Sequence, residues 1–338
     1  MRDDGRLDEL DRAIVNAVQI NPRASWAQVG VVLGVDPTTV VRRWNRVQEA
    51  GIAWITAYAN PVGAAGVLAL VEIDSEGRFL DIAAELADDP ECVTIDITSG
   101  GRDLLLTVTA PDQDGLTRYV LNRLGSLERI RSVRPHLVVR KVADGRSWRL
   151  RHLSEEQVAR LASTVSTPAG GLTPERGFSR DERAVLDCLT EDPRMTAVEI
   201  AARTAFSQKR VGNLLRALLD ARRVALRVDV QRSATGWPVY AWLFLRVPAN
   251  LTDAVSQQLG KLAELRTVLQ VAGPSNVVMA VWLRELADVG RLEAAIAEQL
   301  PHVQISDRSV VLRTTKHAGA VLGEDGRRLR TVDMAFLD

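Results

Sequence analysis

The sequence repeats itself over much of its length. When Pro22 is aligned with Pro193, at a shift of 171 positions, the two segments match without a gap over about 45 residues. Further along, Val138–Arg140 aligns with Val311–Arg313 at a shift of 173. An internal repeat at a nearly fixed shift indicates that the same structural unit occurs twice. Each half must therefore be able to adopt the same fold, which excludes most architectures that a chain of this length could form.

Each half begins with a helical head of about 55 residues, followed by a mixed segment of about 85 residues. Ser154–Gln157 is a capping box that opens a short helix to about Ser163. Residues Thr164–Gly177 after it are rich in Pro, Gly, Ser and Thr and read as an irregular connection. The tail is charged and weakly patterned, so we expect it to be mobile. The predicted divisions are head one at 1–60, mixed domain one at 61–147, a linker at 148–177, head two at 178–231, mixed domain two at 232–322 and a tail at 323–338.

The first head carries the signals of three helices. Apolar residues recur at helical spacing from Leu7 to Val18, and Asn21-Pro22 stops that helix. Ser25 opens a second helix, and Gly34 is suited to end it in a left-handed conformation. Asp36 then caps a third helix that starts at Pro37 and runs to about Ala50. Only three residues separate the second and third helices, which is typical of a helix-turn-helix.

One face of the third helix is basic. Arg42, Arg43 and Arg46 share it with Thr39, while Val40, Trp44 and Val47 form the inward face. An arginine fork can grip a phosphate or pair with guanine in the major groove, although an ordinary solvated face would have the same spacing. The candidate DNA contacts of the first head are Thr38, Thr39, Arg42, Arg43 and Arg46.

The second head repeats the plan with a different face. Its third helix is predicted at Gln208–Ala221, and its candidate contacts are Lys209, Arg210, Asn213 and Arg216. The two heads should therefore read different bases, and the operator should be an imperfect palindrome or two unlike half-sites. The second head would mainly hold phosphates, or would have lost its DNA binding. The formal net charge of zero argues against indiscriminate coating of nucleic acid, but it permits a local basic face.

Each mixed segment has the order of a βαββαβ unit, the ferredoxin-like motif. A single sheet with helices on one side leaves its other face to be buried, so we expect the two sheets to pack face to face. In the first half the predicted elements are a strand at 68–73, a helix at 79–87, strands at 93–97 and 104–109, a helix at 115–124 and a strand at 130–142. In the second half they are a strand at 240–247, a helix at 251–262, strands at 268–272 and 276–283, a helix at 286–299 and a strand at 303–314.

This order resembles the Lrp/AsnC, or feast/famine, family of bacterial and archaeal regulators. The likeness rests on Leu10–Ile14, Val31–Val40, Arg42–Ile52 and the hairpin Gly100–Leu105. It implies an α+β chain in which two winged-helix or helix-turn-helix heads alternate with two ferredoxin-like βαββαβ domains of the RAM or ACT type. The family usually has one head and one sheet domain per chain, so this chain resembles a built-in dimer. The second half departs further, because Gly34, Gly51 and Asp103 correspond to Ala205, Arg222 and Asn276.

The resemblance implies a sequence-specific transcriptional regulator that binds double-stranded DNA and works as a homo-oligomer, either a dimer of tandem chains or larger. It also implies an effector, such as an amino acid or another small molecule, near the two sheet hairpins. By analogy, the candidate effector residues are Gly100, Gly101, Asp103, Gly273 and Asn276. A second interpretation stays open, because Gly and Asp are also the residues that tight turns require.

Other functions have less support in the sequence. A siroheme-decarboxylase-like tetrapyrrole enzyme shares this domain order, but the four histidines, His136, His152, His302 and His317, are not repeated between the halves. A ligand sensor without DNA binding is the remaining alternative. We expect no enzyme activity, no cofactor and no metal site. Cys92 and Cys188 lack metal-type spacing, no apolar run reaches bilayer length, and the N-terminus lacks a signal core, so we expect a cytoplasmic protein with no membrane partner.

Overall fold

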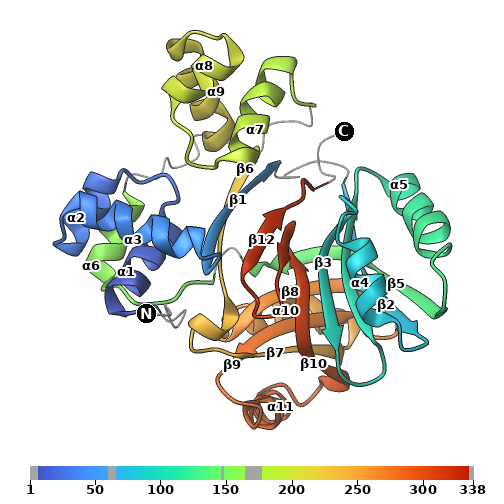
Figure 1. Ribbon diagram of the computed structural model, residues 1–338. Helices are drawn as coiled ribbons and strands as arrows, with labels where there is room; N and C mark the ends of the chain where they lie inside the picture. The colour runs from blue at the N-terminus through green and yellow to red at the C-terminus, as the bar shows by residue number, and fades with distance from the viewer. Residues whose placement is uncertain (1–6, 60–65, 146–147, 164–176, 335–338) are drawn as a thin grey trace. The chain divides into compact units, whose positions relative to one another are not determined.

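The computed structural model describes residues 7–59, 66–145, 148–163 and 177–334 (Figure 1). The chain forms two compact units, and each unit draws on both halves of the sequence. We call the first the head unit; it contains residues up to 66 and 149–230. The second, the sheet unit, contains residues 67–148 and 231–332.

The head unit holds two helix triplets. Their bounds are α1 (Glu9–Ile20), α2 (Trp26–Leu33) and α3 (Pro37–Glu49) in the first head, and α7 (Arg180–Glu191), α8 (Ala197–Thr204) and α9 (Gln208–Asp220) in the second. The capping predictions are confirmed: the Ser25 side chain accepts from the Gln28 backbone N–H, and Asp36 accepts from Thr38. The predicted linker helix is α6 (Glu155–Ala162), opened by the Ser154 capping box. Most of the predicted irregular connection, residues 164–176, lies outside the described residues.

Each triplet is followed by a strand that the sequence analysis did not predict. Strand β1 (Ala53–Ala59) pairs antiparallel with β6 (Val224–Val230), and the register centres on Thr56 opposite Arg227. These two residues are themselves related by the 171-residue shift, so the ribbon has an approximate two-fold symmetry. Ala57 and Ala59 of β1 belong to the hydrophobic core of the second head. The ribbon thus connects the two heads through backbone hydrogen bonds and through packing.

Two turns keep the same backbone conformation although their residues differ between the halves. Gly34 ends α2 at a φ of 68°, and Ala205 ends α8 at a φ of 57°. Likewise, Gly51 has a φ of 68° and Arg222 a φ of 53°. A residue with a Cβ is strained in this left-handed region by roughly 1–2 kcal/mol. The second head therefore keeps the geometry of the first and bears the strain.

Exchanging these residues should change stability in opposite directions. We expect Ala205→Gly to raise the free energy of unfolding by up to about 1 kcal/mol, because relieved strain exceeds the added entropy of the unfolded chain. Gly34→Ala should lower it by a similar amount; a Cβ there would meet no atom within 4 Å, so only the backbone strain changes. Chemical denaturation of the full chain, followed by circular dichroism, measures both. A decrease for Ala205→Gly would contradict this account of the turn.

The sheet unit contains two βαββαβ segments, in the predicted order. In the first half these are β2 (Val67–Ser75), α4 (Phe79–Leu86), β3 (Cys92–Thr98), β4 (Leu104–Ala110), α5 (Gln113–Arg118) continued by the π-helical turn η1 (Tyr119–Leu124), and β5 (Ile130–Ala143). In the second half they are β7 (Val239–Arg246), α10 (Thr252–Leu259), β8 (Leu265–Ala272), β9 (Val277–Leu283), α11 (Asp288–Gln299) and β10 (Gln304–His317). Short 3-10 turns lie at η3 (Arg232–Ala234) and η4 (Ala249–Leu251).

We expected the two segments to form separate sheets packed face to face, and this prediction was wrong. Ten of the described strands form one hydrogen-bonded sheet that closes on itself. Strand β5 pairs with β2 of its own half and then with β8 of the other half. Strand β10 does the same with β7 and then β3. Both strands are 14 residues long, which is enough to serve two neighbours in succession.

Alternation along the strands divides the sheet into two faces. Ala69, Val71 and Ile73 of β2 pack in a core with the helices α4 and α5, whereas Leu70 and Glu72 point to the opposite face. On β7, Ala241, Leu243 and Leu245 join the equivalent core of the second half. Because the sheet is closed, side chains from the two halves meet on the face away from the helices. This is where a buried polar cluster forms.

Part of the predicted tail, residues 323–338, forms a strand, although its sequence is weakly patterned. Strand β11 (Ala320–Leu322) extends the sheet beyond β10, and β12 (Arg328–Thr331) pairs with β11.

Cys92 and Cys188 are both free and buried in apolar cores. None of the helices in the described residues is long and apolar enough to cross a membrane.

Candidate functional site

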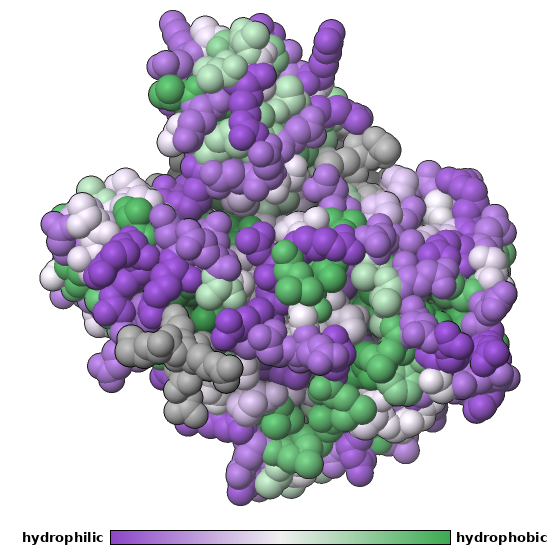
Figure 2. All heavy atoms as spheres, in the orientation of Figure 1, coloured by the Kyte–Doolittle hydropathy of each residue, from purple (hydrophilic) through white to green (hydrophobic). Residues whose placement is uncertain are grey.

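The third helix of the first head has the inward face that the sequence predicted. Val40, Trp44 and Val47 are buried, while Thr38 and Arg42 are exposed. Asn45 also lies on the exposed face, seven positions after Thr38 and three after Arg42. The sequence analysis did not select Asn45, although its spacing opposite the buried residues was a usable signal. Figure 2 shows strongly hydrophilic residues gathered over α1 and α3.

Two of the three predicted arginines are held by carboxylates of the same head. Arg43 Nη1 donates to Asp8 Oδ2 at 2.6 Å and to Asp11 Oδ1 at 3.0 Å. Arg46 Nη2 donates to Asp11 Oδ2 at 2.5 Å, and the Asp11 side chain is only 1% exposed. Partial burial opposes ionisation of Asp8, but the hydrogen bonds from Arg43 and from Asp11, together with the positive charge of Arg43, outweigh it and lower the pKa of that carboxyl. Arg43 and Arg46 therefore fasten α3 to the start of α1.

Arg42 is the predicted arginine that keeps its whole fork available. Within the described part of the chain it has neither a hydrogen bond nor an ion pair. Thr38 lies one turn before it, and its hydroxyl donates to Asp36 Oδ1 at 2.6 Å. Thr39 is half-buried. The exposed polar face of the first head is thus Thr38, Arg42 and Asn45, with Arg46 at its margin.

The second head presents an equivalent face. Lys209, Asn213 and Arg216 are exposed and recur at i, i+4 and i+7 on α9. The 171-residue shift places them on Thr38, Arg42 and Asn45. Arg210, the fourth predicted contact, instead forms an ion pair with Asp181 and lies 4.7 Å from the centre of the Phe206 ring. Three of the four residues predicted for this head therefore share one outward face.

The two polar side chains of the predicted effector region are hydrogen-bonded to the strand beside their hairpin. Asp103 Oδ2 accepts from the backbone N–H and the hydroxyl of Ser75, each at 2.7 Å. Asn276 accepts from the Val247 N–H at 2.9 Å and donates to the Val247 carbonyl at 2.8 Å. In both halves this residue anchors the hairpin to the end of the strand beside it. This geometry favours a turn-forming role for Asp103 and Asn276.

The glycines of the hairpins lie against the long strand of the opposite half. A Cβ on Gly100 would lie 3.4 Å from the Arg308 carbonyl oxygen, and one on Gly273 would lie 2.6 Å from Nδ1 of His136. Gly101 is exposed and has open space around it. The close approach of His136 explains why a residue without a side chain stands at position 273, whereas Gly100 has a φ of 94°, a conformation that glycine adopts readily.

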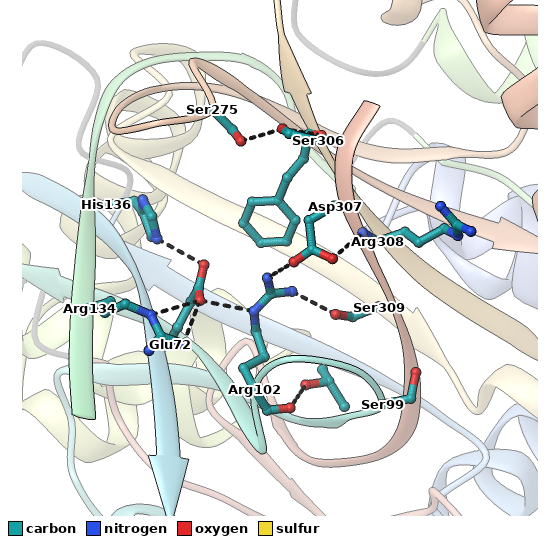
Figure 3. Close-up of polar contacts among 12 residues, drawn as sticks. Glu72, Ser99, Arg102, Arg134, His136, Ser275, Ser306, Asp307, Arg308 and Ser309 are labelled. Carbon is teal, nitrogen blue, oxygen red and sulfur yellow. Dashed lines mark hydrogen bonds and ion pairs between the residues drawn. The ribbon is translucent and has the colours of Figure 1, made fainter. Parts of the chain in front are cut away.

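Beside the first hairpin lies a buried cluster that the sequence analysis missed (Figure 3). Glu72 accepts from Arg134 at 3.1 Å, contacts His136 Nε2 at 2.9 Å and forms an ion pair with Arg102 at 3.1 Å. Arg102 also reaches the other half, donating to Ser309 Oγ at 2.6 Å and pairing with Asp307. Its guanidinium lies 4.2 Å from the centre of the Phe244 ring. The signal available in the sequence was an acidic residue inside an apolar strand, Leu70-Val71-Glu72-Ile73.

Charge balance within this cluster favours the ionised form of Glu72. Burial alone would raise its pKa, but the hydrogen bond with His136 and the positive charge of Arg102 lower the pKa from 4.5 to about 2. The cluster therefore holds a carboxylate and guanidinium groups together between the halves. A buried pair of this kind is destabilising to break, because removing one partner leaves an uncompensated charge.

Replacing Glu72 should change how stability depends on pH. Since the folded-state pKa lies below the ordinary value, the contribution of Glu72 is present above pH 4.5 and is lost as the pH falls toward about 2. We expect Glu72→Gln to lower the free energy of unfolding at pH 7 by about 3 kcal/mol and to weaken the loss of stability between pH 4.5 and 2.

Denaturant unfolding at several pH values measures both effects. Glu76→Gln is the matched control, because that carboxylate is exposed and lies four residues away on the same stretch of chain. If the two variants show the same acid profile as the unmodified chain, the assignment of the acid-sensitive group to Glu72 is wrong.

A second buried carboxyl links the halves elsewhere in the sheet. Asp96 accepts from Trp242 Nε1 at 3.0 Å and from the Thr314 hydroxyl at 2.7 Å. Burial raises the pKa of Asp96, and its hydrogen bonds with Thr314 and Trp242 do not offset this effect, in contrast to Glu72. In the described residues no group of three His, Cys, Asp or Glu side chains could hold a metal ion. His152 lies in the head unit, whereas His136 and His317 lie on β5 and β10 of the sheet unit.

Comparisons with known proteins match the first half of the chain. A model of the AsnC-type helix-turn-helix domain matches residues 7–48, and a model of the Lrp/AsnC ligand binding domain matches residues 67–148. An uncharacterised HTH-type transcriptional regulator of Pyrococcus abyssi is 33% identical over 130 residues, which are 38% of this chain and 82% of the relative. The leucine-responsive regulatory protein of Klebsiella pneumoniae is 29% identical over 145 residues, 40% of this chain and 87% of that protein.

A solved structure matches nearly the whole chain. The siroheme decarboxylase NirDL, in complex with an iron-uroporphyrin III analogue, has a TM-score of 0.58 at 14% identity, over 92% of this chain and 93% of that chain. At this level of identity the likeness concerns the fold.

Proposed function

The chain belongs to the Lrp/AsnC family of DNA-binding transcriptional regulators, and we propose that both of its helix-turn-helix heads contact DNA. The observation that carries this proposal is the outward polar face at equivalent positions of α3 and α9. In helix-turn-helix proteins this helix enters the major groove, while the first helix crosses the backbone. Thr38, Arg42 and Asn45 would serve the first head, and Lys209, Asn213 and Arg216 the second.

We assign different roles to the arginines of α3. Arg42 is the candidate for base or phosphate contact, because its donors are available. Arg43 shares its donors between Asp8 and Asp11, so it positions α3 within the head. Arg46 is bound to Asp11 but remains exposed enough to hold a phosphate.

Binding to DNA upstream of the protein's own gene tests these assignments. At about 0.15 M salt with excess random competitor, weak phosphate contacts are already screened. We expect Arg42→Ala to weaken binding by about 1–3 kcal/mol, and the Lys209→Ala/Asn213→Ala/Arg216→Ala triple variant to weaken it at least as much. Arg118→Ala is the control, since that arginine is exposed on α5 of the sheet unit and carries the same charge. Binding unchanged in both head variants would refute DNA recognition by these faces.

Arg43→Ala separates positioning from contact. We expect it to lower the melting temperature of the head, because Asp8 and Asp11 lose their shared partner, whereas Arg42→Ala should leave that temperature unchanged. A normal melting temperature with weakened binding in Arg43→Ala would instead make Arg43 a direct contact.

We propose further that the chain is a tandem form of the family's unit, modulated by a small molecule such as an amino acid. The exposed backbone at Gly100, Gly101 and Gly273 could hold a carboxylate, while Asp103 and Asn276 keep the hairpins in shape. Calorimetry with single amino acids tests this.

We also propose association into homo-oligomers, either a dimer of tandem chains or larger. Exposed apolar side chains at the equivalent positions Val139 and Leu312 support this proposal. Light scattering measures the oligomeric state.

We assign no catalytic role to the chain, because its relatives are named as regulators. A DNA-binding regulator works where the chromosome lies, which supports a cytoplasmic location. Titration with a tetrapyrrole should leave the absorption spectrum of the pigment unshifted; a shifted spectrum would favour the decarboxylase-like alternative.

A further inference from the structure

The turns after α1 and α7 hold each other through a reciprocal pair of arginines, which we call the arginine clasp. Arg23 donates from Nη1 to the Pro193 carbonyl at 2.6 Å and from Nη2 to the Met195 carbonyl at 2.8 Å. Arg194 donates from Nη1 to the Pro22 carbonyl, and from Nη2 to the Ala24 carbonyl at 2.6 Å. The 171-residue shift converts each of these four hydrogen bonds into another. The clasp is therefore symmetric about the same approximate two-fold axis as the β1–β6 ribbon.

The two guanidinium groups of the clasp are charged and partly removed from water, so they require their hydrogen bonds. Burial lowers the pKa of Arg194 to about 10, helped by the nearby charge of Arg23, and burial also lowers the pKa of Arg23. Both side chains are half-buried and their guanidinium groups stay charged at neutral pH. Removing such a charge from water is destabilising unless the charge is hydrogen-bonded. Arg194 also stacks on the Trp26 ring, with 3.7 Å between its Cζ and the ring centre. The planar fork of arginine directs two donors along fixed directions to the two carbonyls, and lysine would keep the charge but lose this geometry.

The clasp and the ribbon connect the heads at separate places. The ribbon joins the segments that follow α3 and α9, and the clasp joins the turns that precede α2 and α8. Two separate connections remove the hinge that a single connection would leave.

From this geometry we propose that the two heads are one rigid reader, whose DNA partner must present two unlike half-sites at a single spacing and helical phase. This inference rests on the proposed DNA binding. The half-sites must differ because the outward faces of the two heads differ. Where the first head has Thr38, Arg42 and Asn45, the second head has Lys209, Asn213 and Arg216. The spacing must be fixed because neither head can turn to follow a displaced half-site.

An operator series tests the spacing. Inserting five base pairs between the half-sites rotates one of them by about half a turn, whereas ten base pairs restore the phase but not the distance. We expect five inserted base pairs to weaken binding of the unmodified chain on the order of 100-fold, because binding through both heads is lost. In Arg23→Lys/Arg194→Lys the native operator should bind more weakly, and the penalty for insertion should shrink to a few-fold.

Two controls separate this proposal from its alternatives. Arg203→Lys changes an exposed arginine of α8 and should keep the full spacing penalty. Binding of a single half-site should be equal in the clasp variant and the unmodified chain, which shows that each head still folds. If no operator or half-site binds at all, the proposed function fails. If the unmodified chain tolerates five base pairs, or the clasp variant keeps the penalty, DNA binding stands and the rigid reader is wrong.

A measurement without DNA gives an independent test. Spin labels on cysteines at the exposed positions Val31 and Val198 report the distance between α2 and α8. We expect a narrow distance distribution in the otherwise unmodified chain and a broadened one in Arg23→Lys/Arg194→Lys. Equal widths in the two proteins would overturn the role of the clasp.

Discussion

Each βαββαβ sheet would leave unpaired N–H and C=O groups along its edges, and the two long strands satisfy these groups across the halves of the chain. Strand β5 leaves β2 for β8, and β10 leaves β7 for β3. An open edge is a template for pairing with other chains, so closing the sheet removes that hazard. It also explains why the compact units do not follow the order of the sequence: neither sheet segment is complete without the other half.

Closure has a chemical consequence on the face away from the helices. Glu72 lies there among residues of both halves. In the second half the corresponding position holds an apolar residue, Phe244, because Glu72 pairs with Leu105 of β4 and Phe244 pairs with the equivalent Val278 of β9. The charge of Glu72 is therefore balanced by Arg102, which also binds Asp307 and Ser309 of the opposite half. A polar network at such a junction fixes the register of the strands, because a slip of one residue would leave charges unpaired.

The sequence predicted the features that depend on neighbouring residues. Capping side chains and helical spacing defined the two triplets, and alternation defined most strands. It did not predict β1 or β6, because the partner of each strand lies in the other half of the chain. The partners of Arg43 and Arg46 were missed for the same reason, since Asp8 and Asp11 lie more than thirty residues away. Asn45 is a different case, because the buried residues around it define its outward position.

The differences between the halves follow a pattern that bears on function. The residues that shape the heads keep their roles: Arg23 and Arg194 make the same contacts, and Ala205 holds the turn that Gly34 holds with less strain. The residues that face outward differ. Asn213 stands at the position equivalent to Arg42, and Arg216 at the position equivalent to Asn45. A symmetric pair of identical heads can favour only a palindrome. One chain with a shared scaffold and two different faces can favour an asymmetric sequence and can also define its direction along the DNA.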